Sequence, residues 1–186
     1  MKSSHKALVV YESMFGNTSQ VAAGVARGLR LEGLDVELVE VSSAPTQLPR
    51  DLELLVVGAP THAFSLSRRS TRADAVRQGA PAECEQKGLR EWLGTVRFDP
   101  ARPPNLAVFD TRIAKVRWLP KAAGPTAVRL AHKYGLRAVG NPVAFIVADL
   151  QGPLVDGEVD RAVAWGRLLP ARSLDRAAAT GVSRRS

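Results

Sequence analysis

Residues 7–22 read ALVVYESMFGNTSQVA, and they carry the clearest local pattern in the sequence. Its first five residues, Ala7 to Tyr11, form an uninterrupted apolar run of the kind found in parallel strands that are buried on both faces. A short loop of small and hydroxyl-bearing residues follows, and Thr18 to Leu31 then places apolar side chains at helical spacing. The stretch therefore predicts a strand, a tight loop and a helix.

The same alternation continues along the chain and predicts an open parallel sheet with helices on both faces, a three-layer α/β/α sandwich. The 186 residues suffice for one domain, which we place at 1–170, followed by a basic and flexible tail at 171–186 without apolar periodicity. About 50 residues separate the third strand from the fourth, so we expect a long functional loop at 59–90. The further strands are expected at Val36–Val41, Leu52–Val57, Leu106–Phe109 and Val143–Val147, and the further helices at Pro125–Tyr134 and Glu158–Leu169.

The composition excludes several classes of protein. Cys84 is the only cysteine, which rules out an intramolecular disulfide framework and a multi-cysteine metal site. Its neighbours Glu83 and Glu85 should raise the pKa of its thiol. No apolar run approaches the ~20 residues of a membrane-spanning helix, and residues 1–6 show no signal-type cleavage site, so we expect a cytoplasmic protein.

The loop from Glu12 to Thr18 predicts an anion site. Backbone N–H groups gather at the start of the following helix, where the helix dipole favours negative charge. The side chains of Ser13, Asn17 and Thr18 can add hydrogen bonds, and Gly16 allows the backbone to approach the anion closely. The alternative is an ordinary turn in which Thr18 only caps the helix.

The whole of residues 7–22 resembles the first FMN loop of the flavodoxin family, whose usual pattern is Thr/Ser-x-Thr/Ser-Gly-x-Thr. Ser13, Gly16, Asn17 and Thr18 fit this pattern, whereas Phe15 stands where the family commonly has a hydroxyl residue. The resemblance implies a five-stranded sheet of order 2-1-3-4-5, noncovalent FMN and electron transfer between partners. Two alternatives stay open: an FMN-dependent NAD(P)H:quinone-type oxidoreductase, and a flavodoxin-like binding or regulatory module that has lost FMN.

Two more segments resemble the loops that sandwich the flavin ring in this family, VGAPTH at 57–62 and FDTR at 109–112. The resemblance implies ring contacts from His62 or Phe64 on one side and from Trp118 on the other. His62 could also donate a proton, although a polar residue that lines the site is the favoured interpretation. The full set of expected cofactor contacts is Ser13, Met14, Phe15, Gly16, Asn17, Thr18, Pro60, Thr61, His62, Phe64, Asp110, Thr111, Arg112 and Trp118, and no metal ligand is expected.

The net charge of +8 is concentrated in three segments. Residues 62–77, 110–121 and 170–186 each carry a net charge of +3, and the first two adjoin the expected flavin loops. We therefore expect a basic rim that receives an acidic redox partner or an anionic small molecule, with scattered solvated charge as the alternative. Nucleic acid is disfavoured because no recognised motif accompanies the arginines. The rim is expected at Arg68, Arg69, Arg72, Arg112, Lys115 and Arg117.

Overall fold

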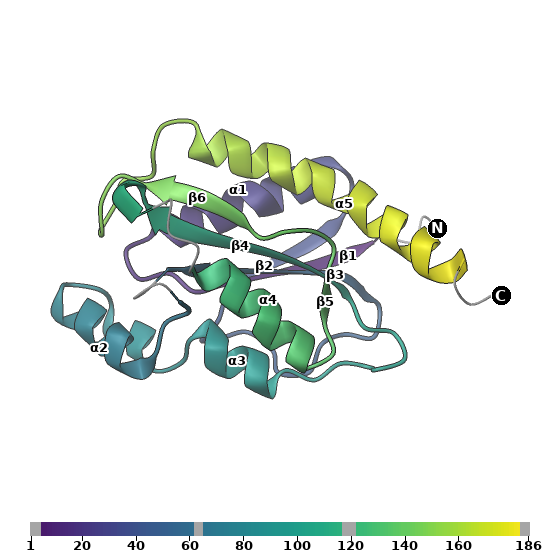
Figure 1. The fold of residues 1–186 in the computed structure, drawn as a ribbon, viewed down its shortest axis with the longest axis horizontal. Helices are drawn as coiled ribbons and strands as arrows, with labels where there is room; N and C mark the ends of the chain where they lie inside the picture. The colour runs from purple at the N-terminus through teal and green to yellow at the C-terminus, as the bar shows by residue number, and fades with distance from the viewer. Residues whose placement is uncertain (1–4, 62–64, 117–121, 183–186) are drawn as a thin grey trace.

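A parallel sheet forms the middle layer of the molecule in a computed structural model that describes residues 5–61, 65–116 and 122–182 (Figure 1). All strand pairs are parallel, and the strand order along the sheet is β2-β1-β3-β4-β5, with β6 also paired to β4. The predicted order 2-1-3-4-5 is therefore confirmed. The strands are β1 (Lys6–Tyr11), β2 (Asp35–Glu40), β3 (Leu52–Pro60), β4 (Asn105–Ile113), β5 (Arg137–Ala138) and β6 (Val143–Val147).

Two short strands share the fifth position of the sheet. Strand β5 pairs with the start of β4, where Asn105 faces Arg137, and β6 pairs with its end, where Phe109 faces Val143. Pro142 lies in the break between them, and proline cannot donate a hydrogen bond to a neighbouring strand. The sequence predicted only the longer piece, because a two-residue strand shows no periodicity.

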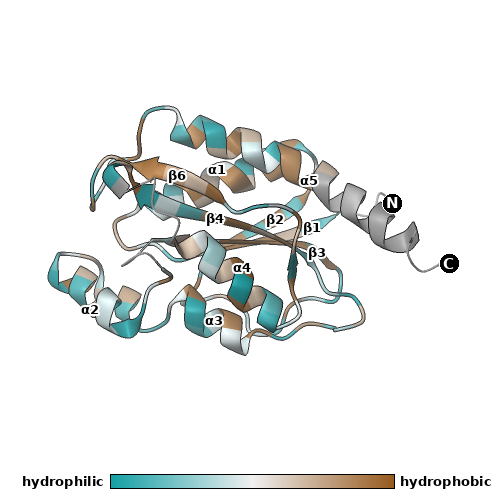
Figure 2. Ribbon diagram, viewed as in Figure 1, coloured by the Kyte–Doolittle hydropathy of each residue, from teal (hydrophilic) through white to brown (hydrophobic). Residues whose placement is uncertain are grey.

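The helices cover both faces of the sheet, as Figure 1 shows. Apolar side chains alternate between the two faces along each strand: Val9 packs with one pair of helices and Val10 with the other. The strands are accordingly the most hydrophobic part of the molecule in Figure 2. One face is covered by α1 (Asn17–Leu31) and α5 (Glu158–Val182), and the other by α3 (Leu89–Thr95) and α4 (Ala123–Lys133).

The segment between β3 and β4 is more structured than a long loop. It contains α2 (Arg69–Arg77) and a short 3-10 helix, η1 (Ala82–Glu85), before α3 begins at Leu89. Helix α2 lies beyond the carboxyl ends of β4 and β6 in Figure 1. A second short 3-10 helix, η2 (Ala114–Val116), follows β4.

The closing helix α5 continues to Val182, well past the expected end at Leu169. It therefore includes most of the segment that we expected to be a tail. Beyond Leu169 the helix leaves the sheet (Figure 1), so no apolar periodicity is needed there, while alanine and arginine still favour helix. Among the described residues, no helix has the length and hydropathy needed to span a bilayer.

Helices α1 and α5 approach each other backbone to backbone. A Cβ at Gly28 would overlap the carbonyl oxygen of Val163, and a Cβ at Gly166 would overlap the carbonyl oxygen of Val25. Both positions require glycine because any side chain would force the two helices apart. This contact sets the distance between α1 and α5 and therefore the place where α1 begins beside the sheet.

We expect Gly28→Ala to lower the free energy of unfolding by about 1–3 kcal/mol, because the added methyl group meets fixed backbone atoms. The matched control is Gly94→Ala in α3, where the nearest atom to the new methyl group is Tyr134 Oη at 3.4 Å. Alanine favours helix over glycine by about 1 kcal/mol, so this control should be neutral or stabilising. Urea unfolding of both variants measures the difference, and equal losses would contradict the packing argument.

Candidate functional site

The loop between β1 and α1 (residues 12–16) presents unpaired backbone N–H groups. Gly16 has φ +83°, a left-handed conformation that favours glycine, and a Cβ there would meet no atom within 4 Å. The Ser13 hydroxyl accepts a hydrogen bond from the Ser19 N–H at 3.2 Å, and Ser19 Oγ donates to the Gly16 carbonyl at 2.7 Å. The N–H groups of residues 14–18 have no acceptor in the described part of the chain. The loop can therefore bind an anion.

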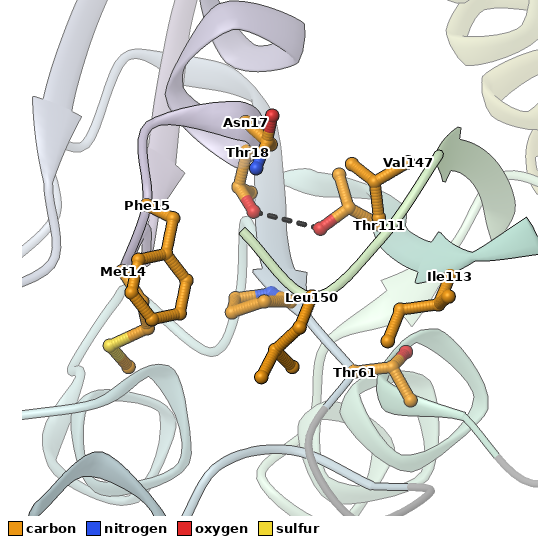
Figure 3. A pocket seen from close by; sticks show the side chains of 10 residues that line it. Met14, Phe15, Asn17, Thr18, Thr61, Thr111, Ile113, Val147 and Leu150 are labelled. Carbon is orange, nitrogen blue, oxygen red and sulfur yellow. Dashed lines mark hydrogen bonds between the residues drawn. The ribbon is translucent and has the colours of Figure 1, made fainter. Parts of the chain in front are cut away.

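A pocket opens beside this loop, at the carboxyl ends of the parallel strands, where open α/β sheets bind ligands (Figure 3). Three threonines contribute to its lining, and apolar side chains make up most of the rest. Thr18 and Thr111 join across it through a hydrogen bond of 2.9 Å between their hydroxyl oxygens, shown dashed in Figure 3. The lining residues are Met14, Phe15, Asn17, Thr18, Pro60, Thr61, Thr111, Ile113, Val147 and Leu150.

Seven of these ten lining residues were predicted from the sequence, namely Met14, Phe15, Asn17, Thr18, Pro60, Thr61 and Thr111. The predicted contacts Ser13 and Gly16 belong to the loop but do not line the pocket. His62, Phe64 and Trp118 lie outside the described residues, so their expected ring contacts stay predictions.

Asp110 and Arg112 were expected beside Thr111 in a loop, but β4 continues to Ile113. Neighbouring residues of a strand point to opposite faces, so Thr111 and Ile113 reach the pocket while Asp110 and Arg112 turn away. The fully buried Asp110 carboxylate accepts hydrogen bonds from Arg112 Nε at 2.5 Å and from the Gly124 N–H at 2.8 Å. Asp110 thus holds the start of α4.

The turn after β6 reaches across the start of α1. Asn17 Nδ2 donates to the Gln151 carbonyl at 3.1 Å, and Gln151 Nε2 donates to the Gln78 carbonyl at 3.0 Å. Leu150 at the tip of this turn is 47% exposed and faces the pocket in Figure 3. Leu150, Ile113 and Val147 were missed: a longer strand at 106–113 would have indicated Ile113, but no local signal links the 148–152 turn to a loop some 130 residues earlier.

Arg72 does not belong to the expected basic rim, because it is only 1% exposed. Its Nη1 and Nη2 each donate to a carboxylate oxygen of Glu91 at 3.2 Å, Nη1 also donates to Ser67 Oγ at 3.0 Å, and Nε donates to the Glu85 carbonyl at 3.2 Å. The prediction was wrong because a count of charges along the sequence cannot show which cation is buried among carboxylates.

The rest of the expected rim is divided. Arg68, Arg69 and Lys115 are exposed, and Arg112 is paired with Asp110. Arg117 lies outside the described residues. The positive surface near the pocket is therefore smaller than the sequence suggested.

Glu12, directly before the loop, is 2% exposed. Its Oε2 accepts a hydrogen bond from the Leu89 N–H at 2.7 Å, whereas Oε1 has no partner among the described residues. Burial raises the pKa of this carboxyl above its ordinary value, while Ser67, the Leu89 N–H and Arg72 oppose the shift.

Cys84 is also buried, and its Sγ donates to the Ser13 carbonyl at 3.4 Å. The predicted rise in the pKa of its thiol is confirmed, but burial is the main cause, and Glu40 and Glu12 contribute more than the neighbouring Glu83.

We expect Arg72→Met to lower the free energy of unfolding by about 1–3 kcal/mol. The variant leaves the buried Ser67 hydroxyl and the Glu85 carbonyl without their donor, and it removes the cation that acts on the buried Glu12 carboxyl. The control is Arg69→Met in the same helix, whose side chain is 83% exposed and which should change stability by less than about 0.5 kcal/mol. Urea unfolding compares the two variants, and a small loss for Arg72→Met would refute its structural role.

No protein-family model and no curated protein matches this sequence. Solved structures resemble the described fold. A flavodoxin from the domain Archaea superposes with a TM-score of 0.61 at 15% identity over 90% of this chain and 98% of its own. A Streptococcus pneumoniae TIGR4 flavodoxin superposes with a TM-score of 0.56 at 17% identity over 90% of this chain and 99% of its own.

The Flv1 flavodiiron core from Synechocystis superposes with a TM-score of 0.62 at 15% identity and covers 94% of this chain. This chain spans only 37% of that core, so it matches one part of a larger protein. The likeness agrees with the strand order and with the pocket at the carboxyl ends of the strands. The chain therefore has the flavodoxin fold.

Proposed function

We propose that this chain binds FMN noncovalently in the pocket of Figure 3 and transfers electrons between redox partners. The observation that carries the proposal is the set of N–H groups of residues 14–18, which lack acceptors among the described residues and belong to a segment that helps to line a pocket with apolar walls. A ligand with a phosphate at one end and a flat, largely apolar ring at the other has the chemistry to satisfy both parts.

The phosphate end of the site would be held mainly by neutral donors. The backbone N–H groups of residues 14–18 would donate to it, and the Ser13 hydroxyl accepts from Ser19 and so keeps its own hydrogen free to donate. The Asn17 amide uses one N–H on Gln151 and keeps a second. Neutral donors at a helix start stabilise an anion without a lysine.

The ring end of the site would be enclosed by apolar side chains. In Figure 3 Phe15 lies on one side of the pocket, Ile113 and Val147 lie on the other, and Leu150 lies between them. FMN supplies the electron chemistry when it is bound, and the chain binds it, orients it and excludes water. An apolar wall disfavours added charge on the ring, which is how these residues would adjust its reduction potential.

We also propose a basic rim, with fewer residues than the sequence predicted. Arg68, Arg69 and Lys115 are the exposed cations that remain from the predicted rim among the described residues. They would attract an acidic partner or an anionic small molecule, with an association rate that falls as salt increases.

We expect the purified protein to carry flavin absorbance, or to take up FMN with a stoichiometry of about one per chain. Dialysis with FMN followed by a visible spectrum and by quenching of flavin fluorescence measures this uptake. Colourless protein that gains no FMN under these conditions would remove both the carrier and the reductase interpretations. Steady NADPH consumption with a quinone, in the absence of an added reductase, would favour the reductase over the carrier.

We expect Gly16→Ala to weaken FMN binding by about tenfold or more, because alanine at φ +83° strains the loop whose N–H groups would hold the phosphate. Gly33→Ala is the matched control: Gly33 has φ +85°, it too has no atom within 4 Å of its Cβ position, and it lies beyond the far end of α1. Both variants should lose about 1 kcal/mol of stability through the same backbone conformation. Titration of flavin fluorescence compares their affinities, and equal affinities would place the phosphate elsewhere.

A further inference from the structure

We propose that Glu12 is a positioning residue that couples anion binding at the β1–α1 loop to the uptake of a proton. The inference rests on the proposed function, in which the anion is the phosphate of FMN. It goes further because it assigns a role to a buried carboxyl that does not line the pocket.

The geometry places Glu12 directly behind the loop. Glu12 is the first residue after β1, and its own N–H donates to the Gly58 carbonyl at 2.9 Å, which fixes its backbone to β3. Its side chain turns into the interior, where Oε2 accepts from the Leu89 N–H and Oε1 has no partner among the described residues. A buried oxygen without a donor is costly when it carries charge and much less so in a protonated carboxyl.

The groups that surround Glu12 do not provide it with a dedicated cation. Arg72 of α2 is close enough to act on Glu12 electrostatically, but its hydrogen bonds go to Ser67, Glu91 and the Glu85 carbonyl. Glu91 of α3 adds a second negative charge nearby. The side chains of Arg72, Ser67 and Glu12 meet at Gly88. A Cβ at Gly88 would lie 2.4 Å from Arg72 Nη1, 2.8 Å from Ser67 Oγ and 3.0 Å from Glu12 Oε2, so this position has no room for a side chain that could donate to Glu12.

The other titratable and charged groups on the helices and strands around Glu12 add no cation that pairs with its carboxylate. Cys84 of η1 stays a neutral thiol because burial raises its pKa, and Glu40 of β2 is a carboxyl whose pKa burial also raises. Arg90 of α3 directs its guanidinium to the carbonyl oxygens of Ser67 and Leu66. An ionised Glu12 therefore shares one cation with Glu91.

A phosphate bound to the N–H groups of residues 14–18 adds up to two negative charges to a segment that begins two residues after Glu12. Water screens their repulsion weakly, because Glu12 and Thr18 are buried. Binding then favours the protonated carboxyl: a proton from solvent adds to the Glu12 carboxylate, and no other bond changes. The pKa of Glu12 must rise on binding, so proton uptake peaks between its values in the free and the bound protein, and the affinity for FMN falls as pH rises through that interval.

The loop itself transmits the coupling. Met14 packs with Ala75, Ala80 and Cys84, so the segment that surrounds Glu12 also supports the loop that would hold the phosphate. Glu12→Gln is the informative variant, because the amide oxygen can accept from the Leu89 N–H and the NH₂ group can donate to Ser67. The variant keeps these contacts and cannot titrate.

The test is calorimetric titration of the protein with FMN between pH 5 and 8.5, in pairs of buffers with different ionisation enthalpies, which counts the protons exchanged on binding. Riboflavin serves as the ligand without phosphate. Glu37→Gln, at an exposed residue of β2, serves as the control variant. The ionisation of the FMN phosphate is common to all three proteins, so the difference between them isolates Glu12.

With FMN, the wild type and Glu37→Gln should take up about half a proton more than Glu12→Gln at the peak, and with riboflavin they should show no such excess. Relative to Glu12→Gln, their affinity for FMN should fall by roughly tenfold across the interval. Equal proton counts in all three proteins, or the same uptake with riboflavin in the wild type, would overturn the inference and leave FMN binding intact. Absence of FMN binding at every pH would instead overturn the proposed function and this inference with it.

Discussion

The buried guanidinium of Arg72, which pairs with the half-exposed carboxylate of Glu91, holds the segment between β3 and β4 against the rest of the molecule. Helix α2 buries only Arg72 and Ala75, so apolar burial contributes little to its docking. The guanidinium instead donates hydrogen bonds to Ser67, to Glu91 and to the Glu85 carbonyl, three points within the 25 residues from 67 to 91. Without this cation the segment would leave buried acceptors unpaired, and Ala75, Ala80 and Cys84 would no longer be held against Met14.

The β3–β4 segment packs beneath the β1–α1 loop, and this packing accounts for the aromatic residue at position 15. Phe15 lines the pocket and also packs against the small cluster that includes Met14, Ala80 and Cys84. A hydroxyl residue there would offer one more hydrogen bond to an anion but would leave that cluster open to water. The departure from the family's usual pattern thus matches a feature of this chain, a helical segment packed beneath the loop.

The central sheet and the β1–α1 loop were predictable because local patterns encode them. An apolar run, a small-residue loop and a helical repeat follow one another within residues 7–31, and each is determined by its own residues. Strand β4 was cut short at Phe109 because Asp110, Thr111 and Arg112 are polar. These polar residues act on opposite faces of the strand. Thr111 lines the pocket, while Asp110 pairs with Arg112 and accepts a hydrogen bond from the start of α4.

Contacts between segments that are distant in the sequence could not be predicted from sequence patterns, and the reason is physical. The 148–152 turn meets Asn17 and Gln78 through a backbone carbonyl and a single side-chain amide, and neither leaves a periodic signal. The burial of Arg72 was hidden in the same way, since its partners Ser67 and Glu91 are ordinary surface residue types. Both errors concern the surroundings of the β1–α1 loop rather than the loop itself. The donors of that loop are neutral, so buried charged groups nearby exert the strongest electrostatic effect on any ligand there. These groups are Glu12 and Arg72, and their burial is visible only in the structure.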